Sequence, residues 1–389
     1  MSFKEDIGKK WLCPLPFIHT TMRQGGTYAT CCEAWRTTTN IKIDEVSPIE
    51  FFNSEHSQNL RKAFLTDQPQ NEPIVQNACR KCIGAEESFG YSKRTRDSQE
   101  LKLDSYKYLE KNYNIAQKDI NQHIEPHMDF IKIECGNTCN LKCVMCVPSA
   151  SSLIGGYVYD PDFTDEVYKD LDKILKNCTV LQFAGGEPLL LKNSCLKVIQ
   201  WCIDMGHSHL EIHFNTNGTI PVSRFEKYLP HFRKVSLNVS IDAYGERDEY
   251  IRWNTKWEKK DKNLHDYLLL QKDWGKGKFF VGLNPTIQSL NIGYLDELYD
   301  YGQQLGIKID PKNIVWSPVK HNAQHLPIKI KKHYIEKLKQ YDFPTVEGVL
   351  QSVEGDHKIF LNLLNDLKIM DQKRQIKFLD LWPEFEEYC

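Results

Sequence analysis

The chain of 389 residues lacks any run of eighteen apolar residues, the approximate length that a helix needs to cross a bilayer. Its start, MSFKEDIGKKW, carries charges where a secretory signal needs an apolar stretch. A large net charge is absent too, because 50 basic residues stand against 52 acidic ones, for a net charge of −2. No overall field therefore draws the protein to nucleic acid or to an anionic surface. We expect a cytoplasmic protein with no membrane partner and no indicated nucleic-acid partner.

Internal repeats and low-complexity tracts are also missing, which argues against solenoids and long disordered arms. The composition, with 41% hydrophobic and 26% charged residues, is ordinary for a globular protein. A chain of this length predicts two or three units, each with a core of its own.

Cysteine, in contrast, is plentiful, with 13 residues. In a reducing compartment such residues serve more often as metal ligands or catalytic thiols than as disulfides. Cys139, Cys143 and Cys146 stand close together in CGNTCNLKCVMC. Three thiolates can hold three irons of a four-iron cube and leave the fourth iron without a protein ligand. The alternative is a zinc knuckle completed by a histidine, although no histidine stands at finger spacing.

Short β-rich runs alternate with helical stretches from residue 130 onward. The predicted strands are 129–133, 180–183, 210–214, 235–240, 279–283 and 313–316, and the predicted helices include 165–175, 189–205, 265–274 and 294–305. Strands separated by helices predict parallel pairing with helical crossovers. The fold class is therefore α/β, and six strands fit an open, partial (β/α)6 barrel.

Polar motifs follow these strands at the end where β/α barrels carry their chemistry. They are the cysteine loop after the first strand, Gly185-Gly186-Glu187 after the second, 215–217 after the third, Ser240 and Asp242 after the fourth, Thr286 and Gln288 after the fifth, and Pro318 after the sixth. This placement predicts one site at the carboxyl edge of the sheet.

The cysteine loop and the downstream GGE turn together resemble those of the radical S-adenosylmethionine (radical SAM) enzymes. The resemblance covers residues 130–319 and agrees with the partial barrel. It implies a [4Fe-4S] cluster that binds S-adenosylmethionine (SAM), cleaves it reductively to a 5′-deoxyadenosyl radical and so abstracts hydrogen from a substrate. It also implies an electron donor such as flavodoxin or ferredoxin.

By this resemblance, Gly185 and Gly186 would let the backbone approach the methionine end of SAM, with its ammonium group at Glu187. Taken alone, the glycine pair could equally be a tight turn. Met145 stands where the family usually has an aromatic residue near the adenine. A thioether can still contact a ring.

The run VSLNVSIDA supplies Ser240 and Asp242, which the resemblance places near the ribose and methionine groups together with Asn217. Arg252 could pair with the carboxylate. Without the resemblance, Ser240 and Asp242 would be interpreted as a strand end and a turn cap.

A second cysteine set precedes the barrel. It comprises Cys13, Cys31, Cys79 and Cys82, with four residues between Gly26 and Cys31. This order resembles the twitch, or half-SPASM, domain, which binds one auxiliary [4Fe-4S] cluster and in known relatives follows the barrel. Four thiolates would close all four irons, so this cluster would transfer electrons or shape a pocket. A tetrahedral zinc site is the alternative.

Cys32, beside Cys31, leaves the choice between these two ligands open, and we prefer Cys31 on the glycine spacing. The remaining cysteines have no such spacing. Cys195 and Cys202 are expected in the core, and Cys135 could be a hydrogen donor.

The expected domains are a twitch-like domain over 1–105, a connector over 106–126, the barrel over 127–320 and a C-terminal helical segment over 321–389. The stretch 97–118 is polar enough for us to expect it at the surface. The C-terminal segment is expected to cover the barrel mouth.

The sequence leaves three functions open. A peptide or protein side chain is the leading substrate, by analogy with twitch and SPASM relatives. Radical modification of a nucleotide, a sugar or another small anionic metabolite is the second. A non-catalytic interaction protein with two zinc sites is the third.

Overall fold

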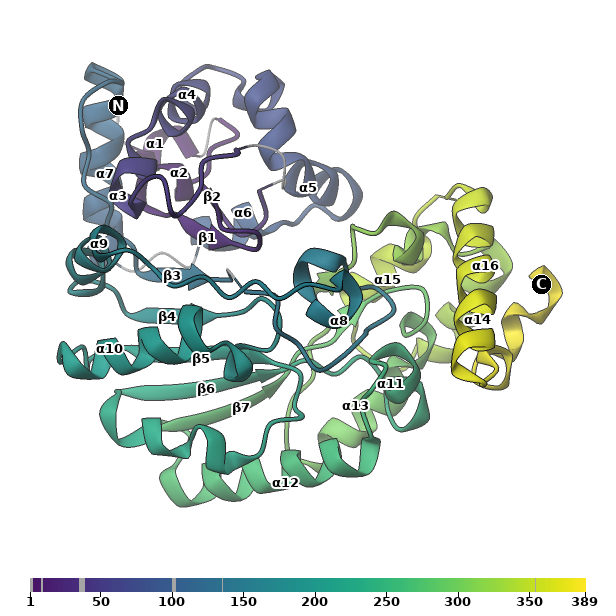
Figure 1. Ribbon diagram of the computed structural model, residues 1–389. Helices are drawn as coiled ribbons and strands as arrows, with labels where there is room; N and C mark the ends of the chain where they lie inside the picture. The colour runs from purple at the N-terminus through teal and green to yellow at the C-terminus, as the bar shows by residue number, and fades with distance from the viewer. Residues whose placement is uncertain (1–2, 8–9, 35–38, 100–102, 135, 354) are drawn as a thin grey trace. The chain divides into compact units, whose positions relative to one another are not determined.

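The computed structural model describes residues 3–7, 10–34, 39–99, 103–134, 136–353 and 355–389 (Figure 1). Its strands are β1 Thr21–Arg23, β2 Thr27–Ala29, β3 Phe130–Ile133, β4 Val180–Phe183, β5 Glu211–Thr216, β6 Lys234–Val239, β7 Phe279–Leu283, β8 Thr286–Ile287 and β9 Asn313–Ile314. Its α-helices up to the cysteine loop are α1 Phe3–Ile7, α2 Leu15–Ile18, α3 Pro48–Phe52, α4 Glu55–Phe64, α5 Pro73–Phe89, α6 Lys93–Gln99 and α7 Leu103–Lys118. Those after it are α8 Ser152–Gly155, α9 Asp165–Leu175, α10 Val198–Asp204, α11 Glu246–Ile251, α12 Trp257–Trp274, α13 Leu295–Gln304, α14 Ile328–Leu338, α15 Pro344–Gln351 and α16 His357–Arg374.

One seven-stranded sheet has the order β2-β1-β3-β4-β5-β6-β7. Strands β1, β3, β4 and β5 pair in parallel, and β2 pairs with β1 antiparallel. Along β3, Ile131 and Ile133 are fully buried, whereas Lys132 between them is half-buried. This alternation follows the two-residue period of a strand and gives the sheet one apolar and one more polar face. The α/β class is confirmed.

Strand β9 differs from the expectation. It pairs with β8 in a separate two-stranded parallel sheet rather than joining the seven-stranded one. Pro311 and Pro318 flank this segment, and proline cannot donate to a strand ladder. The hairpin β1–β2 instead extends the large sheet beyond β3, which the sequence did not indicate.

The chain divides into two compact units, and the first comprises residues 1–138, 157–214 and 227–235. Its N-terminal helices, grouped around β1 and β2 in Figure 1, share a core that includes Phe3, Phe17, Leu109 and Tyr113. The expectation of a surface position for residues 97–118 is wrong for α7, because one face of this helix is apolar and its Leu109 and Tyr113 are buried.

Helix α9, also in the first unit, shows why the predicted helices form. The Thr164 side chain caps its first turn by accepting from the Val167 amide. Val167, Leu171 and Ile174 are buried at spacings of four and three residues, which place them on one helix face. The prediction of 165–175 is confirmed.

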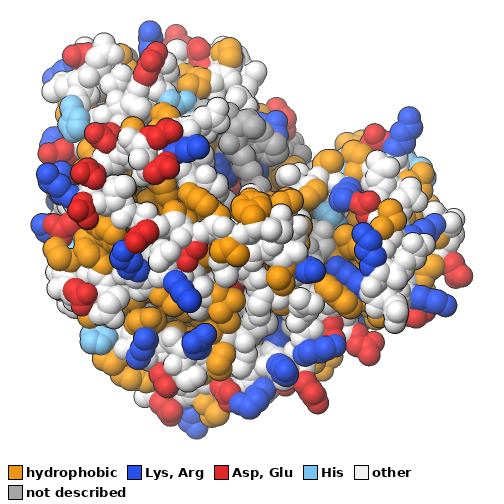
Figure 2. Space-filling view, viewed as in Figure 1, with side chains coloured by type: hydrophobic (Ala, Val, Ile, Leu, Met, Phe, Trp, Pro, Cys, Tyr) orange, Lys and Arg blue, Asp and Glu red, His pale blue; other side chains and the backbone are white. Residues whose placement is uncertain are grey.

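The second unit comprises residues 139–156, 215–226 and 236–389. Its last part is helical, as expected, with α14 and α16 near the C-terminus (Figure 1). Within its basic run, Lys331 is buried and donates to the Ser352 and Val353 carbonyls. Figure 2 shows basic and acidic side chains interspersed on the visible face. Among the described residues, no helix is long and apolar enough to span a membrane.

Candidate active site

The cysteine loop lies in the second unit, where its backbone pairs with the end of α11. The Lys142 amide donates to the Trp253 carbonyl at 2.9 Å, and the Val144 amide donates to the Ile251 carbonyl at 2.8 Å. Cys143 stands between these two bonds. The loop is therefore held on both sides of its central cysteine.

Serines at the start of α8 hold the rest of the loop. The Ser151 hydroxyl donates to the Leu141 carbonyl at 2.7 Å, and the Cys139 amide donates to Ser152 Oγ at 3.2 Å. The Cys146 amide closes a turn onto the Cys143 carbonyl at 3.0 Å. Protein hydrogen bonds thus fix the loop at each of its three cysteines.

The three thiols share one electrostatic environment. The pKa of the Cys143 thiol is raised to about 12, mainly by burial and also by the thiols of Cys146 and Cys139, while the Arg252 guanidinium opposes the rise. A buried thiol without metal stays protonated, whereas iron binds the thiolate. Three clustered thiols beside a cation are a donor set that fits an iron–sulfur cluster.

Arg252 belongs to a buried network with two carboxylates. Its Nη2 lies 2.9 Å from Asp242 Oδ2, and its Nε lies 3.9 Å from Asp248 Oδ1. Asp248 also pairs with Lys260, whose Nζ lies 2.6 Å from Asp248 Oδ2. All four side chains are at most 8% exposed. Burial lowers the pKa of Arg252, but Asp242 and the nearby acidic groups raise it more, so the group stays charged.

The other residues predicted in the second unit lie around this network and the loop. Asn217 donates to Asn140 Oδ1 at 2.8 Å, and its amide lies 4.0 Å from Cys139 Sγ. The Ser240 amide donates to the Thr216 carbonyl at 2.7 Å. The Gln288 amide lies 3.8 Å from the Met145 sulfur.

The GGE turn lies in the first unit and packs on the backbone just before the cysteine loop. A Cβ on Gly186 would lie 2.2 Å from the Thr138 carbonyl oxygen, and one on Gly185 would lie 2.6 Å from that of Gly136. The φ of Gly185 is +118°, a conformation that glycine adopts most easily. Glu187 is fully buried, and its carboxylate accepts from the Leu189 amide. The protein's own backbone thus requires both glycines.

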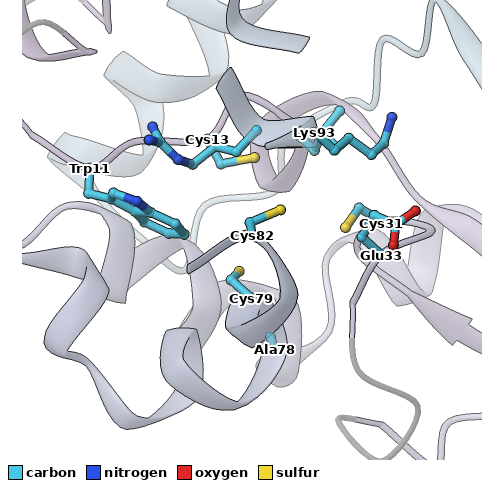
Figure 3. A pocket seen from close by; sticks show the side chains of 10 residues that line it. Trp11, Cys13, Cys31, Glu33, Ala78, Cys79, Cys82 and Lys93 are labelled. Carbon is cyan, nitrogen blue, oxygen red and sulfur yellow. The ribbon is translucent and has the colours of Figure 1, made fainter. Parts of the chain in front are cut away.

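The N-terminal cysteines come together in the first unit. Cys13, Cys31, Cys79 and Cys82 line one small cavity, with Cys79 and Cys82 on α5 (Figure 3). Burial raises the pKa of Cys31, and the neighbouring thiols of Cys32, Cys82 and Cys13 add to the rise. Lys93 and Arg94 also line the cavity.

Several observations bear on what this cavity could hold. Its volume is about 20 Å³, and four cysteine side chains line it. No three His, Cys, Asp or Glu side chains of the described residues meet closely enough for a single metal ion. Cys32 is not among the lining residues. Burial raises the pKa of its thiol, Lys93 and Lys132 oppose the rise, and Glu33 adds to it.

Residues 133–268 match the model of the radical SAM superfamily. This chain contains a radical SAM domain. The chain is therefore an enzyme, and the domain implies a SAM-binding [4Fe-4S] cluster. The matched segment contains the cysteine loop, the GGE turn and the buried network, and the N-terminal cysteines lie outside it.

Two curated proteins of Methanocaldococcus jannaschii are similar to parts of this chain. A 7,8-dihydro-6-hydroxymethylpterin dimethyltransferase is 35% identical over 88 residues, which are 22% of this chain and 16% of that protein. An uncharacterized protein is 24% identical over 239 residues, which are 60% of this chain and 79% of that one.

Two solved structures are also similar. They are anSMEcpe with bound AdoMet (TM-score 0.40, 20% identity, 55% of this chain and 59% of that one) and Streptococcus suis SuiB bound to S-adenosylmethionine (TM-score 0.39, 13% identity, 74% and 62%). This chain thus spans less than two thirds of either structure.

Four residues near the cysteine loop were missed from the sequence. Asp248 could have been found, because it stands four residues before Arg252 on one helix face. Lys260 stands in the charged run WEKKDKN, and Arg374 stands in DQKRQIK, so both would be interpreted as solvated. His321 is fully buried beside the Val144 backbone, and no spacing pointed to it. Cys195 and Cys202 are buried as expected, and Cys135 lies outside the described residues.

Proposed function

We propose that this enzyme cleaves SAM reductively at a [4Fe-4S] cluster held by Cys139, Cys143 and Cys146, and abstracts hydrogen from a peptide or protein side chain. The observation that carries the proposal is the loop itself. Its three thiols are clustered, and backbone hydrogen bonds from the Lys142 and Val144 amides hold it in place. When bound, the cluster supplies the electron that breaks the sulfonium bond of SAM.

The chain's own residues would bind and orient SAM. Gly185, Gly186 and Glu187 would border its methionine end, and Met145 would lie near the adenine. Because Glu187 is fully buried, it can receive an ammonium group away from bulk water, where a charged hydrogen bond is stronger.

Asn217, Ser240 and Asp242 would serve the ribose and methionine groups, and Arg252 the carboxylate. Asp242 holds Arg252 at 2.9 Å, so the guanidinium is oriented before any ligand arrives. Such preorganisation lowers the entropy that binding costs.

An auxiliary [4Fe-4S] cluster on Cys13, Cys31, Cys79 and Cys82 completes the proposal. Its support is the meeting of these cysteines, which lie far apart in the chain, in one cavity that contains Cys31 and not Cys32. The cluster would accept an electron from the substrate radical during oxidation. A flavodoxin or ferredoxin would donate the electron for SAM cleavage.

The substrate class rests on the pairing of this cysteine set with a radical SAM domain, as in twitch and SPASM relatives. The local similarity to a pterin-modifying enzyme favours a second candidate, a small heterocyclic or anionic metabolite. The enzyme assignment sets the non-catalytic zinc protein aside, and zinc remains an alternative only at the N-terminal cysteines.

Anaerobic reconstitution tests both clusters. We expect about eight irons per chain, for two four-iron clusters, and release of 5′-deoxyadenosine on reduction with SAM. Replacing Cys139, Cys143 and Cys146 with alanine should abolish that release and remove about four irons. Replacing Cys79 and Cys82 should remove the other four and spare part of the release.

Matched cysteine variants complete the test. Cys31→Ala should lower the iron content, whereas Cys32→Ala and the buried Cys202→Ala should not. Zinc at the N-terminal cysteines, or equal loss of 5′-deoxyadenosine in both multiple variants, would contradict the proposed division of roles. Mass changes in a peptide library and in a set of pterins and nucleotides would separate the two substrate classes.

A further inference from the structure

The C-terminal end of α16 packs against the segment that holds the cysteine loop. The Tyr250 hydroxyl donates to Asp371 Oδ1 at 2.8 Å, and the Phe378 amide donates to Asp371 Oδ2 at 2.7 Å. Gln375, at φ +57°, ends the helix and turns the chain toward Phe378. Asp371 thereby fixes the helix end beside residues 250–253.

Arg374, in the last turn of α16, reaches both backbone segments. Its Nη1 donates to the Tyr250 carbonyl at 3.1 Å, and its Nη2 donates to the Lys142 carbonyl at 3.4 Å. Its guanidinium carbon lies 4.5 Å from the ring centroid of Trp253. One side chain thus joins the C-terminal helix, the segment 250–253 and the residue just before Cys143.

We propose that Arg374 is a positioning residue of the SAM-cluster loop, so that the C-terminal helical segment forms part of the cluster site. This inference rests on the proposed function only in assuming that the loop binds a cluster. The contacts between Arg374 and the loop are present in the protein without iron, so they can be tested separately.

Two physical effects follow from this arrangement. A guanidinium is a planar fork that can donate to two carbonyls at once, whereas a lysine ammonium is a compact charge that would hold one of them. A cation near the Cys143 thiolate also favours the more negative, reduced form of a cluster, which raises its reduction potential. Substitutions of Arg374 can therefore separate its effect on the position of the loop from the effect of its charge on the cluster.

Arg374→Gln removes both the paired hydrogen bonds and the positive charge. Arg374→Lys keeps the charge and removes mainly the ability to donate to two carbonyls at once. Arg247→Gln is the matched control: Arg247 also donates to a carbonyl of the C-terminal segment, that of Leu381, at 3.2 Å. It also stacks on an aromatic ring, that of Tyr294, 3.7 Å from the ring centroid. Arg247 donates to the Leu381 carbonyl and to the Glu297 carboxylate, neither of which belongs to the cysteine loop.

The first measurement is amide hydrogen exchange of residues 139–146 in the full chain before reconstitution. We expect roughly tenfold faster exchange in Arg374→Gln, from the loss of charge-assisted bonds, and a clear increase in Arg374→Lys. Arg247→Gln should match the wild type in this segment. Unchanged exchange in both Arg374 variants, or an equal increase in Arg247→Gln, would overturn the proposal.

The second measurement is the midpoint potential of the SAM cluster, followed by electron paramagnetic resonance in variants that also lack Cys79 and Cys82. Arg374→Gln should shift the potential to more negative values, and Arg374→Lys should keep most of the wild-type value. Equal potentials in all three proteins would overturn the electrostatic part. If no SAM cluster assembles in the wild type, the proposed function fails while the exchange result still decides the role of Arg374.

Discussion

Lys260→Met measures how strongly the buried ion network stabilises the site. Lys260 is fully buried with its Nζ 2.6 Å from Asp248, which is fully buried as well. Methionine keeps the length of the side chain and removes its charge, so Asp248 would retain only Arg252, at 3.9 Å, which already pairs with Asp242. Removing one partner of a buried pair costs about 3–5 kcal/mol.

The second partner can be neutralised to test this reasoning. Asp248→Asn keeps an oxygen that can accept from the Asp242 amide, a bond of 3.0 Å in the structure. The double variant Lys260→Met/Asp248→Asn leaves one balanced pair, Asp242 with Arg252. We therefore expect it to lose no more than about 1.5 kcal/mol, since replacing both partners of a buried pair is often nearly neutral.

The assay is equilibrium unfolding in urea of the protein without iron, followed by tryptophan fluorescence and circular dichroism. Lys262→Met on the same helix is the control, because its pair with Asp266 also measures 2.6 Å but its side chain is 73% exposed. That variant should lose at most about 0.5 kcal/mol. A loss below about 1 kcal/mol in Lys260→Met, or a double variant no more stable than the single one, would refute the reasoning.

Two further predictions concern the GGE turn and a buried histidine. Gly186→Ala should lower both the affinity for SAM and the free energy of unfolding, because the new Cβ would lie 2.2 Å from the Thr138 carbonyl oxygen. Gly277→Ala is the control, since its Cβ would meet open space. Equal SAM affinities by isothermal titration and equal urea unfolding of the two variants would contradict this prediction. Burial and Lys320 lower the pKa of His321 to about 4, below the 6.5 of an unfolded histidine, so its neutral form stabilises the fold at higher pH. The free energy of unfolding should therefore fall by about 2 kcal/mol from pH 8 to pH 5. Urea unfolding of His321→Gln should show a smaller fall. An identical fall in both proteins would be inconsistent with a lowered pKa of His321.

Five strands of the large sheet were predictable, because each follows from a local apolar run. The strands predicted from apolar runs agree with β3 to β7 within one or two residues at each end. Parallel pairing then places the polar residues that follow these strands at one edge of the sheet. The N-terminal cysteines, which the resemblance grouped, line one cavity in the structure. Short strands such as β1 and β2 carry too few residues to show a period.

The buried charges were not predictable, for a physical reason. Lys260 and Lys262 stand two residues apart in one charged run, yet the first is buried and the second exposed. Which lysine is buried depends on Asp248, twelve residues away, and on the packing of α12 against α11. Arg374 likewise acquires its role from contacts with Tyr250 and Lys142 that are distant in sequence.

The coordination of SAM to the loop cluster can be observed by electron paramagnetic resonance. In the variant without Cys79 and Cys82, the reduced protein should give one cluster signal, and addition of SAM should change its g values because the ligand binds the iron that lacks a cysteine. A reduced signal that SAM leaves unchanged would contradict the account.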